Sequence, residues 1–188
     1  MRMTSAILTL ALTALVLLGC AKTPPPAAPE PAMQKDNKFK LTSTAFKEGQ
    51  PIPRQHTCDG VNVSPALEWS SAPPTARTFA IICDDPDAPS GTWVHWVLYN
   101  LPGDRIGLVE NVPATEKVPV DGLQGTNDLK KIGYGGPCPP SGTHHYFFKL
   151  YALDAELSLP AGATKAELLK AMEGHIVGQT QLMGIYRR

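Results

Sequence analysis

The sequence has no excess of charge of either sign. Lysine and arginine together number 17, aspartate and glutamate also number 17, and the isoelectric point is about 6.9. No basic stripe runs along the 188 residues. Binding to DNA or RNA depends on clustered lysine and arginine side chains that neutralise phosphates. We therefore expect no nucleic-acid partner.

The sequence also lacks an apolar run long enough for a comfortable membrane span, which needs about 20 residues. The run from Ala6 to Leu18 is shorter and follows the positive charge of Arg2, as in a secretion signal. The residues Leu17-Leu18-Gly19-Cys20 resemble the lipobox of bacterial lipoproteins, in which cleavage precedes the cysteine and the thiol is acylated. We expect residues 1–19 to be a signal peptide and Cys20 to be lipidated.

Residues 20–38 contain almost nothing that could build a core. They are rich in alanine and proline, which predicts an extended, semi-stiff tether. Ala21, in place of an aspartate after Cys20, resembles lipoproteins that are directed to the outer membrane. We expect a folded domain at residues 39–188 that is lipid-anchored in a bacterial cell envelope, on the outer membrane and facing the periplasm.

Cysteines are few, with four in the chain. If Cys20 is acylated, Cys58, Cys83 and Cys138 remain. An oxidising compartment favours one disulfide among these three, and one thiol is then left over. The spacing does not show which pair forms. We expect the remaining thiol to be a small buried hydrophobic group.

The alternation of strands and helices that is typical of parallel α/β folds is missing, and no internal repeat is visible. Apolar patterning predicts one helix that begins at the T-x-x-E capping box of Thr164 to Glu167. Gly174 is expected to end or kink this helix. Its apolar stripe would comprise Ala166, Leu168, Leu169, Met172 and Ile176. Strands are predicted at residues 39–46, 66–69, 78–83, 92–100 and 144–152. A largely antiparallel β-fold follows.

Two regions of the chain are irregular. Asp104 to Lys131 is rich in glycine and polar residues, and we expect a long surface excursion there. Gly133 to Gly142 is rich in glycine and proline. At Gly135 and Gly136 we expect backbone conformations that other residues avoid, with consecutive amides pointing into one concavity that suits a small anion.

The alternation of residues along each predicted strand indicates which side chains lie on the same face of that strand. It places His144 and Tyr146 together and turns His145 away. In the strand at 92–100 it places Trp93, His95, Val97 and Tyr99 on one face, and Val94, Trp96 and Leu98 on the other.

The loop amides, the histidine imidazoles and the tyrosine hydroxyl are hydrogen-bond donors. Donors of this kind converge on oxyanions such as phosphate. Carboxylates at Asp85 and Asp87 would orient imidazole N–H groups or meet a ligand ammonium. Taken singly, His95 is compatible with a core histidine, and the two aspartates with turn caps. Only the joint placement of these residues predicts an anion pocket.

The motifs together resemble the phosphatidylethanolamine-binding family, also called Raf kinase inhibitor proteins. The resemblance rests on Asp85-Pro-Asp-Ala-Pro89 with Trp93-Val-His95-Trp, and on Gly-Gly-Pro137 with Gly142-Thr-His144-His-Tyr146. Cys58-Asp-Gly60 and Gly136-Pro-Cys-Pro-Pro140 resemble its bacterial branch. The resemblance implies a Greek-key β-sandwich whose pocket accepts phosphate or phosphorylethanolamine. The residues that it implies in or behind this pocket are Asp85, Asp87, Trp93, His95, Gly136, Pro137, His144 and Tyr146.

We therefore expect a binding protein for a small anionic or phosphorylated ligand, with no cofactor, no metal and no enzymatic activity. An alternative is an inhibitor or adaptor, for example of a protease, that acts through the excursion at 104–131. Kinase inhibition does not transfer, because a protein outside the cytosol meets no cytosolic kinase. A metal site is disfavoured because no His-x-x-x-His spacing occurs. A hydrolase using Ser141 or Cys138 is disfavoured because no base is marked.

Overall fold

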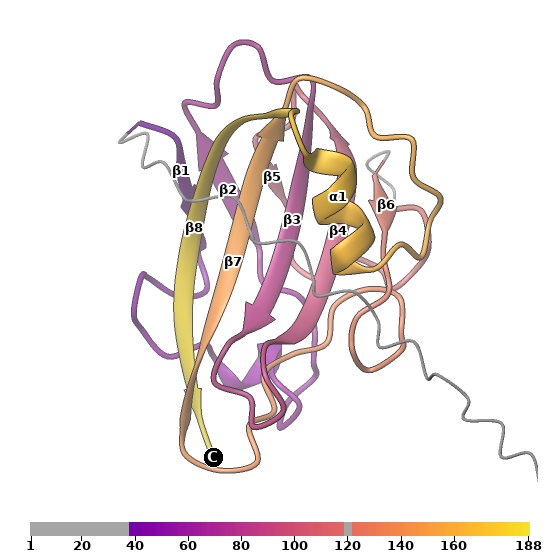
Figure 1. Ribbon diagram of the computed structural model, residues 1–188. Coiled ribbons are helices and arrows are strands. Elements are labelled where there is room, and N and C mark those ends of the chain that lie inside the picture. Colours follow the sequence, from indigo (N-terminus) through magenta and orange to yellow (C-terminus); the bar gives the residue numbers. More distant parts are fainter. Residues whose placement is uncertain (1–37, 119–121) are drawn as a thin grey trace, which may run out of the picture.

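The structure, a computed structural model, describes residues 38–118 and 122–188. The expected signal peptide, Cys20 and nearly all of the tether lie outside these residues. Two antiparallel sheets pack face to face, and one helix covers the outer side of the larger sheet (Figure 1). The strands are β1 (Lys40–Thr42), β2 (Leu67–Ser70), β3 (Thr78–Asp85), β4 (Trp93–Pro102), β5 (Gly107–Leu108), β6 (Leu123–Gln124), β7 (Thr143–Leu153) and β8 (Ile176–Arg187). The mainly β, antiparallel fold predicted from the sequence is confirmed.

The larger sheet has the strand order β6-β4-β3-β7-β8, and the smaller has the order β1-β2-β5. After β4 the chain passes through β5 of the smaller sheet, returns to the larger sheet as β6 beside β4, and then crosses to the other side of β3 as β7. Such a crossover is a feature of Greek-key sandwiches. Because β3 runs antiparallel to both neighbours, its C-terminal end meets the starts of β4 and β7 at one end of the molecule.

All eight residues of β3 are buried because both faces of this strand are covered. Phe79, Ile81 and Cys83 belong to the core between the two sheets. Ala80 and Ile82 face the opposite way and pack in a second core, which includes residues of the helix. This arrangement explains why the segment reads as a continuous apolar run rather than as an alternating one.

Strand β7 alternates as the sequence predicts. Tyr146, Phe148 and Leu150 belong to the inter-sheet core, and Tyr151 packs on the helix side. The C-terminal segment forms the 12-residue strand β8 and pairs along the whole of β7, which the sequence-based strand assignment did not include.

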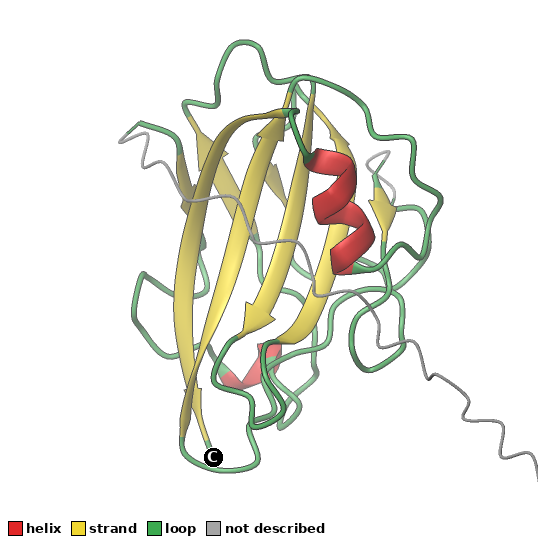
Figure 2. Ribbon diagram, in the orientation of Figure 1, coloured by secondary structure: helices red, strands yellow, loops and turns green. Residues whose placement is uncertain are grey.

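The helix α1 (Lys165–Met172) begins with the predicted capping box between Thr164 and Glu167. It buries Leu168, Leu169 and Met172. The predicted stripe was wrong at its two ends, since Ala166 is exposed and Ile176 already belongs to β8. A 3₁₀ turn, η1 (Arg54–His56), is the other short helical element (Figure 2). None of the described helices has the length and apolar character needed to cross a membrane.

The predicted faces of β4 were wrong around His95. Cys83 lies opposite Trp96, whereas the next residue of β3, Asp84, lies opposite Val94. His95 is therefore the extra residue of a β-bulge, and simple alternation breaks there. Val94 consequently shares the helix side with Val97 and Tyr99, and not the face of Trp96.

Two other expectations need correction. The first strand is only residues 40–42 and not 39–46. The segment at 104–131 is more than a surface excursion, because it contributes β5, β6 and buried side chains. Among these, Gln124 accepts a hydrogen bond from Trp96 Nε1 (2.8 Å) and donates to two backbone carbonyls, so this segment is anchored to the sheet.

Candidate functional site

A cavity of about 410 Å³ lies where β3 ends and β4 and β7 begin. Three of its residues, Asp85, His95 and His144, are ionisable and buried. Exposed residues such as Pro89, Ser90 and Leu129 form its outer part. The lining residues are Asp85, Ala88, Pro89, Ser90, Trp93, His95, Leu129, Gly136, Cys138, Pro139, Pro140 and His144. The cavity thus combines ionisable groups at its buried side with a largely apolar entrance.

His144 is held by Asp85, whose Oδ2 atom lies 2.7 Å from Nδ1 of the imidazole. His144 is the second residue of β7, and Asp85 is the last residue of β3. A carboxylate accepts a hydrogen bond, so the proton of the imidazole lies on Nδ1 and Nε2 is left for a ligand. The sequence-based expectation that an aspartate orients an imidazole thus fits the geometry of Asp85.

His95 is held in the same way by a neutral group. Its Nδ1 donates to the carbonyl oxygen of Gly135 at 2.6 Å. Its ring meets Tyr146 edge-on, with 5.2 Å between the ring centroids. Burial lowers the pKa of His95, against the opposing effects of the Gly135 carbonyl and of nearby carboxylates, of which Asp85 is the strongest. His95 is therefore neutral at neutral pH and leaves Nε2 as an acceptor on the cavity side.

Tyr146 lies directly behind this cavity. Its side chain is fully buried, and its hydroxyl makes no hydrogen bond of good geometry among the described residues, although the Asp85 carboxylate and the Cys138 backbone lie close enough to interact with it. Burial, followed by the charge of Asp85, raises the pKa of Tyr146, so the phenol keeps its proton. A buried hydroxyl without a partner is costly and rare in folded proteins. This hydroxyl belongs to the tyrosine that packs against the ring of His95.

The glycine loop does not act as we expected. Gly135 N–H donates to the carbonyl of His95 (2.9 Å), and Gly136 N–H donates to Asn62 Oδ1 (2.7 Å). Both amides are thus bonded within the protein, and neither glycine has a positive φ. The reason for glycine is close packing, because a Cβ on Gly136 would lie 2.3 Å from the carbonyl oxygen of His56.

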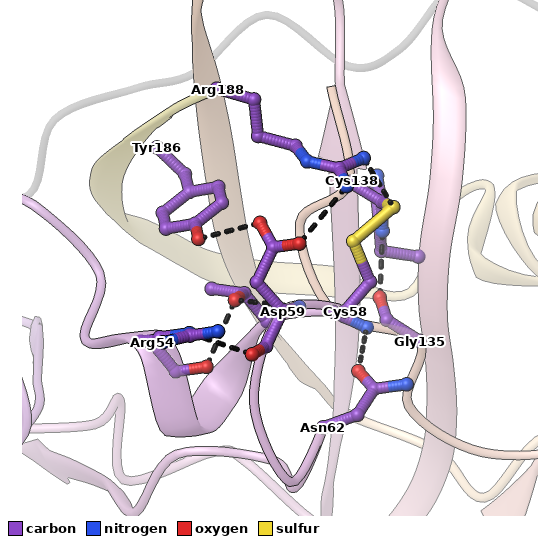
Figure 3. The surroundings of a disulfide bond; sticks show 11 residues. Arg54, Cys58, Asp59, Asn62, Gly135, Cys138, Tyr186 and Arg188 are labelled. Atoms are coloured by element: carbon purple, nitrogen blue, oxygen red, sulfur yellow. Dashed lines mark hydrogen bonds and ion pairs between the residues drawn. A yellow bond between two sulfur atoms is a disulfide. The ribbon is translucent and has the colours of Figure 1, made fainter. Parts of the chain in front are cut away.

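The wall of the cavity is attached to a distant loop by a disulfide between Cys58 and Cys138, which are 80 residues apart in sequence. Figure 3 shows its surroundings. Asp59 accepts a hydrogen bond from Tyr186 (2.8 Å) and forms an ion pair with Arg188 (3.0 Å). Tyr186 and Arg188 therefore also hold the turn at residues 58–59 in place. The remaining cysteine, Cys83, is buried. Its burial, with the charges of nearby carboxylates, raises the pKa of the thiol.

The other predicted site residues lie at different distances from the cavity. Trp93 and Gly136 line it. Pro137 is adjacent, and its carbonyl accepts the Cys58 N–H. Asp87 does not line it. Its Oδ2 atom accepts from the backbone N–H of His145 and lies 2.6 Å from Nδ1 of that residue. These hydrogen bonds lower the pKa of Asp87.

Several residues that shape the site were not anticipated from the sequence. Asn62 takes up the Gly136 amide, Tyr134 donates to the carbonyl of His56 (2.8 Å), and Leu129 forms part of the lining. Each acts through contacts between segments that are far apart in sequence. Asn62 lies in the sequence Asn62-Val-Ser-Pro65, whose residues are typical of turns, but this pattern does not indicate a hydrogen bond to Gly136. Within residues 38–118 and 122–188, no three histidine, cysteine or acidic side chains are grouped to hold a metal ion.

The chain is similar to a set of bacterial and archaeal proteins. A UPF0098 protein of Methanothermobacter thermautotrophicus is 53% identical over 150 residues, which cover 80% of this chain and 99% of that protein. A UPF0098 protein of Aquifex aeolicus is 46% identical over 155 residues, covering 80% of this chain and 89% of that protein.

Solved structures share the fold. A phosphatidylethanolamine-binding protein homologue from Chlamydia trachomatis superposes with a TM-score of 0.75 at 42% identity, covering 81% of this chain and 99% of that one. Escherichia coli YbcL, described as a member of the mammalian PEBP family, gives a TM-score of 0.75 at 31% identity, covering 80% and 99%. The family model for phosphatidylethanolamine-binding proteins matches residues 42–187. Sequence and fold thus agree that this chain belongs to the phosphatidylethanolamine-binding protein family.

Proposed function

We propose that this protein is a non-enzymatic binding protein that captures a small phosphorylated or otherwise anionic group in the cavity at the end of β3. One observation carries the proposal. The fully buried Tyr146 hydroxyl makes no hydrogen bond of good geometry and lies beside the ring of His95, and the Nδ1 atoms of His95 and His144 are already bonded. A phosphate-like group supplies an acceptor for the phenol, and it can bond to each Nε2 through a proton held by the imidazole or by the phosphate.

The lining favours a ligand that has a charged head and an organic remainder. The ionisable residues are buried, whereas Trp93, Pro139 and Pro140 offer apolar surface along the wall. Ligand sites of this size are commonly apolar with a few convergent polar groups. Phosphorylethanolamine fits this description, and its ammonium would be compatible with the single lining carboxylate, Asp85.

We also propose that the protein acts at a membrane surface in the cell envelope. The support comes from residues 1–20, whose sequence matches a signal peptide and lipobox. Intact-mass measurement of the protein purified from a bacterial membrane fraction tests this. Cleavage before Cys20 with added acyl mass supports the anchor, and an unmodified cysteine rejects it.

The binding proposal is tested by titrating purified protein with phosphate and phosphorylethanolamine, using calorimetry. Two matched tyrosine variants sharpen the test. Tyr146→Phe removes a hydroxyl that makes no hydrogen bond of good geometry, so the free energy of unfolding should hardly fall, while ligand affinity should fall about tenfold. Tyr134→Phe removes a hydroxyl that is bonded to the His56 carbonyl, so the unfolding free energy should fall by about 1 kcal/mol, while affinity should fall much less than in Tyr146→Phe.

A second binding variant is His144→Ala, which should abolish saturable binding if the protein remains folded. Absence of binding to the wild-type protein would reject the pocket. In that case the alternative of a protein-surface inhibitor comes first, since Ile106 and Val109 in the segment at 104–131 are three-quarters exposed. Replacing both with serine would then remove inhibition of a target protease.

A further inference from the structure

The cavity has an unusual charge composition for an anion site. None of its lining residues is a lysine or an arginine. The ionisable lining residues are Asp85, His95 and His144. Protein sites for phosphate ordinarily supply positive charge from arginine or lysine. Among the lining residues, only the two imidazoles can carry a positive charge to compensate a negative ligand.

The two histidines differ in the charge of the group that bonds to Nδ1 of the imidazole. His144 faces the carboxylate of Asp85 at 2.7 Å. If its imidazole is charged, that charge is already balanced by the carboxylate. Nδ1 of His95 bonds instead to the neutral carbonyl of Gly135. A bound oxyanion therefore needs one more positive charge, and His95 is the lining residue that can provide it.

The tautomer and charge of His95 determine whether its Nε2 atom accepts or donates a hydrogen bond at the ligand. Nδ1 carries a proton because it donates to the Gly135 carbonyl. In the neutral ring, Nε2 is then an acceptor, and two acceptors repel when an oxyanion approaches. Addition of a proton converts Nε2 into a charged donor, which forms a strong hydrogen bond to an oxyanion.

We propose that an oxyanion binds this cavity together with one proton, which Nε2 of His95 takes up from the solvent. This inference rests on the proposed function and names the protonation that accompanies it. In the step, the neutral imidazole becomes an imidazolium, no covalent bond of the ligand breaks, and the new positive charge balances the charge of the ligand. Anion capture is then favoured by mild acidity.

Other titratable groups around His95 support rather than oppose this protonation. They come from β3, from β7 and from the segment after β6, and are Asp84, Asp85, His144, Tyr146 and Asp128. The three carboxylates raise the pKa of His95, although burial outweighs them in the absence of an anion. A bound anion adds a further negative charge at the ring and shifts the balance towards the imidazolium.

The test is imidazole ¹⁵N NMR of the purified protein near neutral pH, with and without saturating phosphorylethanolamine. We expect the Nε2 resonance of His95 to move from the unprotonated to the protonated position on saturation. His145 and His175 are paired with Asp87 and Asp154 outside the cavity, so their resonances should not change. A saturable response of other cavity residues with His95 still neutral would overturn the inference and leave the proposed function standing.

A variant gives an independent measure. His95→Gln replaces the imidazole with a side-chain amide, which does not titrate. The ionisation of the ligand itself is common to both proteins, so it cancels in the ratio of wild-type to variant affinity. This ratio should fall by up to about tenfold for each pH unit above the ordinary histidine pKa of 6.5. A ratio that is independent of pH contradicts the inference. If neither protein binds the ligand, the proposed function and the inference fail together.

Discussion

Asp85 and His144 form a buried pair, with 2.7 Å between Oδ2 of the carboxylate and Nδ1 of the imidazole. They come from neighbouring antiparallel strands, at the end of β3 and the start of β7. The carboxylate sets the tautomer of the imidazole and fixes the orientation of its ring. The same negative charge also repels an anionic ligand, so its net effect on binding can be decided by substitution.

We expect Asp85→Asn to weaken phosphorylethanolamine binding by about tenfold. The amide oxygen can still accept from His144 Nδ1, but a charge-assisted hydrogen bond becomes a weaker neutral one, which positions the imidazole less firmly. Calorimetric titration near neutral pH measures the effect. Asp87→Asn is the matched control, because Asp87 bonds to His145 and does not line the cavity. Tighter binding in Asp85→Asn would mean that repulsion of the ligand dominates.

His95 should make stability depend on pH in the absence of ligand. Burial lowers the pKa of His95 in the folded protein below 6.5, so the unfolded chain binds more protons between these two pKa values. The free energy of unfolding should therefore fall as the pH drops from 6.5 towards the folded pKa. Urea unfolding at a series of pH values measures this slope. His95→Gln should flatten it, and an unchanged slope would show that another group titrates.

Removing the disulfide should lower stability strongly. The bond closes a loop of about 80 residues, for which the loss of chain entropy in the unfolded state corresponds to about 4 kcal/mol. We expect the double variant Cys58→Ser with Cys138→Ser to lose about this amount in urea unfolding. Cys83→Ala is the control, since this buried thiol forms no disulfide, and it should lose about 1 kcal/mol.

The disulfide variant also reports on the site, because Cys138 lines the cavity and Pro137 bonds to Cys58. We expect its phosphorylethanolamine affinity to fall along with its stability. Retention of full affinity would show that the hydrogen bonds of Gly136 and Tyr134 alone hold the cavity wall in place.

Gly136→Ala should destabilise the protein by about 2 kcal/mol, because an added Cβ would lie 2.3 Å from the backbone oxygen of His56. The two loops would have to separate, and the hydrogen bond from Gly136 to Asn62 would lengthen. Thermal unfolding measures the change. Ser141→Ala is the control in the same loop, since this side chain is exposed. Equal stability of both variants would contradict the close-packing explanation.

Features that depend on neighbouring residues could be predicted from the sequence. The alternation of β7 put His144 and Tyr146 on the core side, because successive side chains of a regular strand point to opposite faces. The capping box at Thr164 and Glu167 correctly predicted the start of α1, since both bonds lie within one helical turn. The family was recognised because its motifs are short and continuous.

The tertiary structure alone decided the features that depend on distant partners. The bulge at His95 arises from pairing with β3, and alternation within β4 carries no sign of it. The pairing of Cys58 with Cys138 depends on loops that only the fold brings together. The amides of Gly135 and Gly136 are bonded to His95 and Asn62, which are 40 and 74 residues away. Local chain geometry determines a periodic pattern, whereas the partner of each polar group is determined by how the whole chain packs.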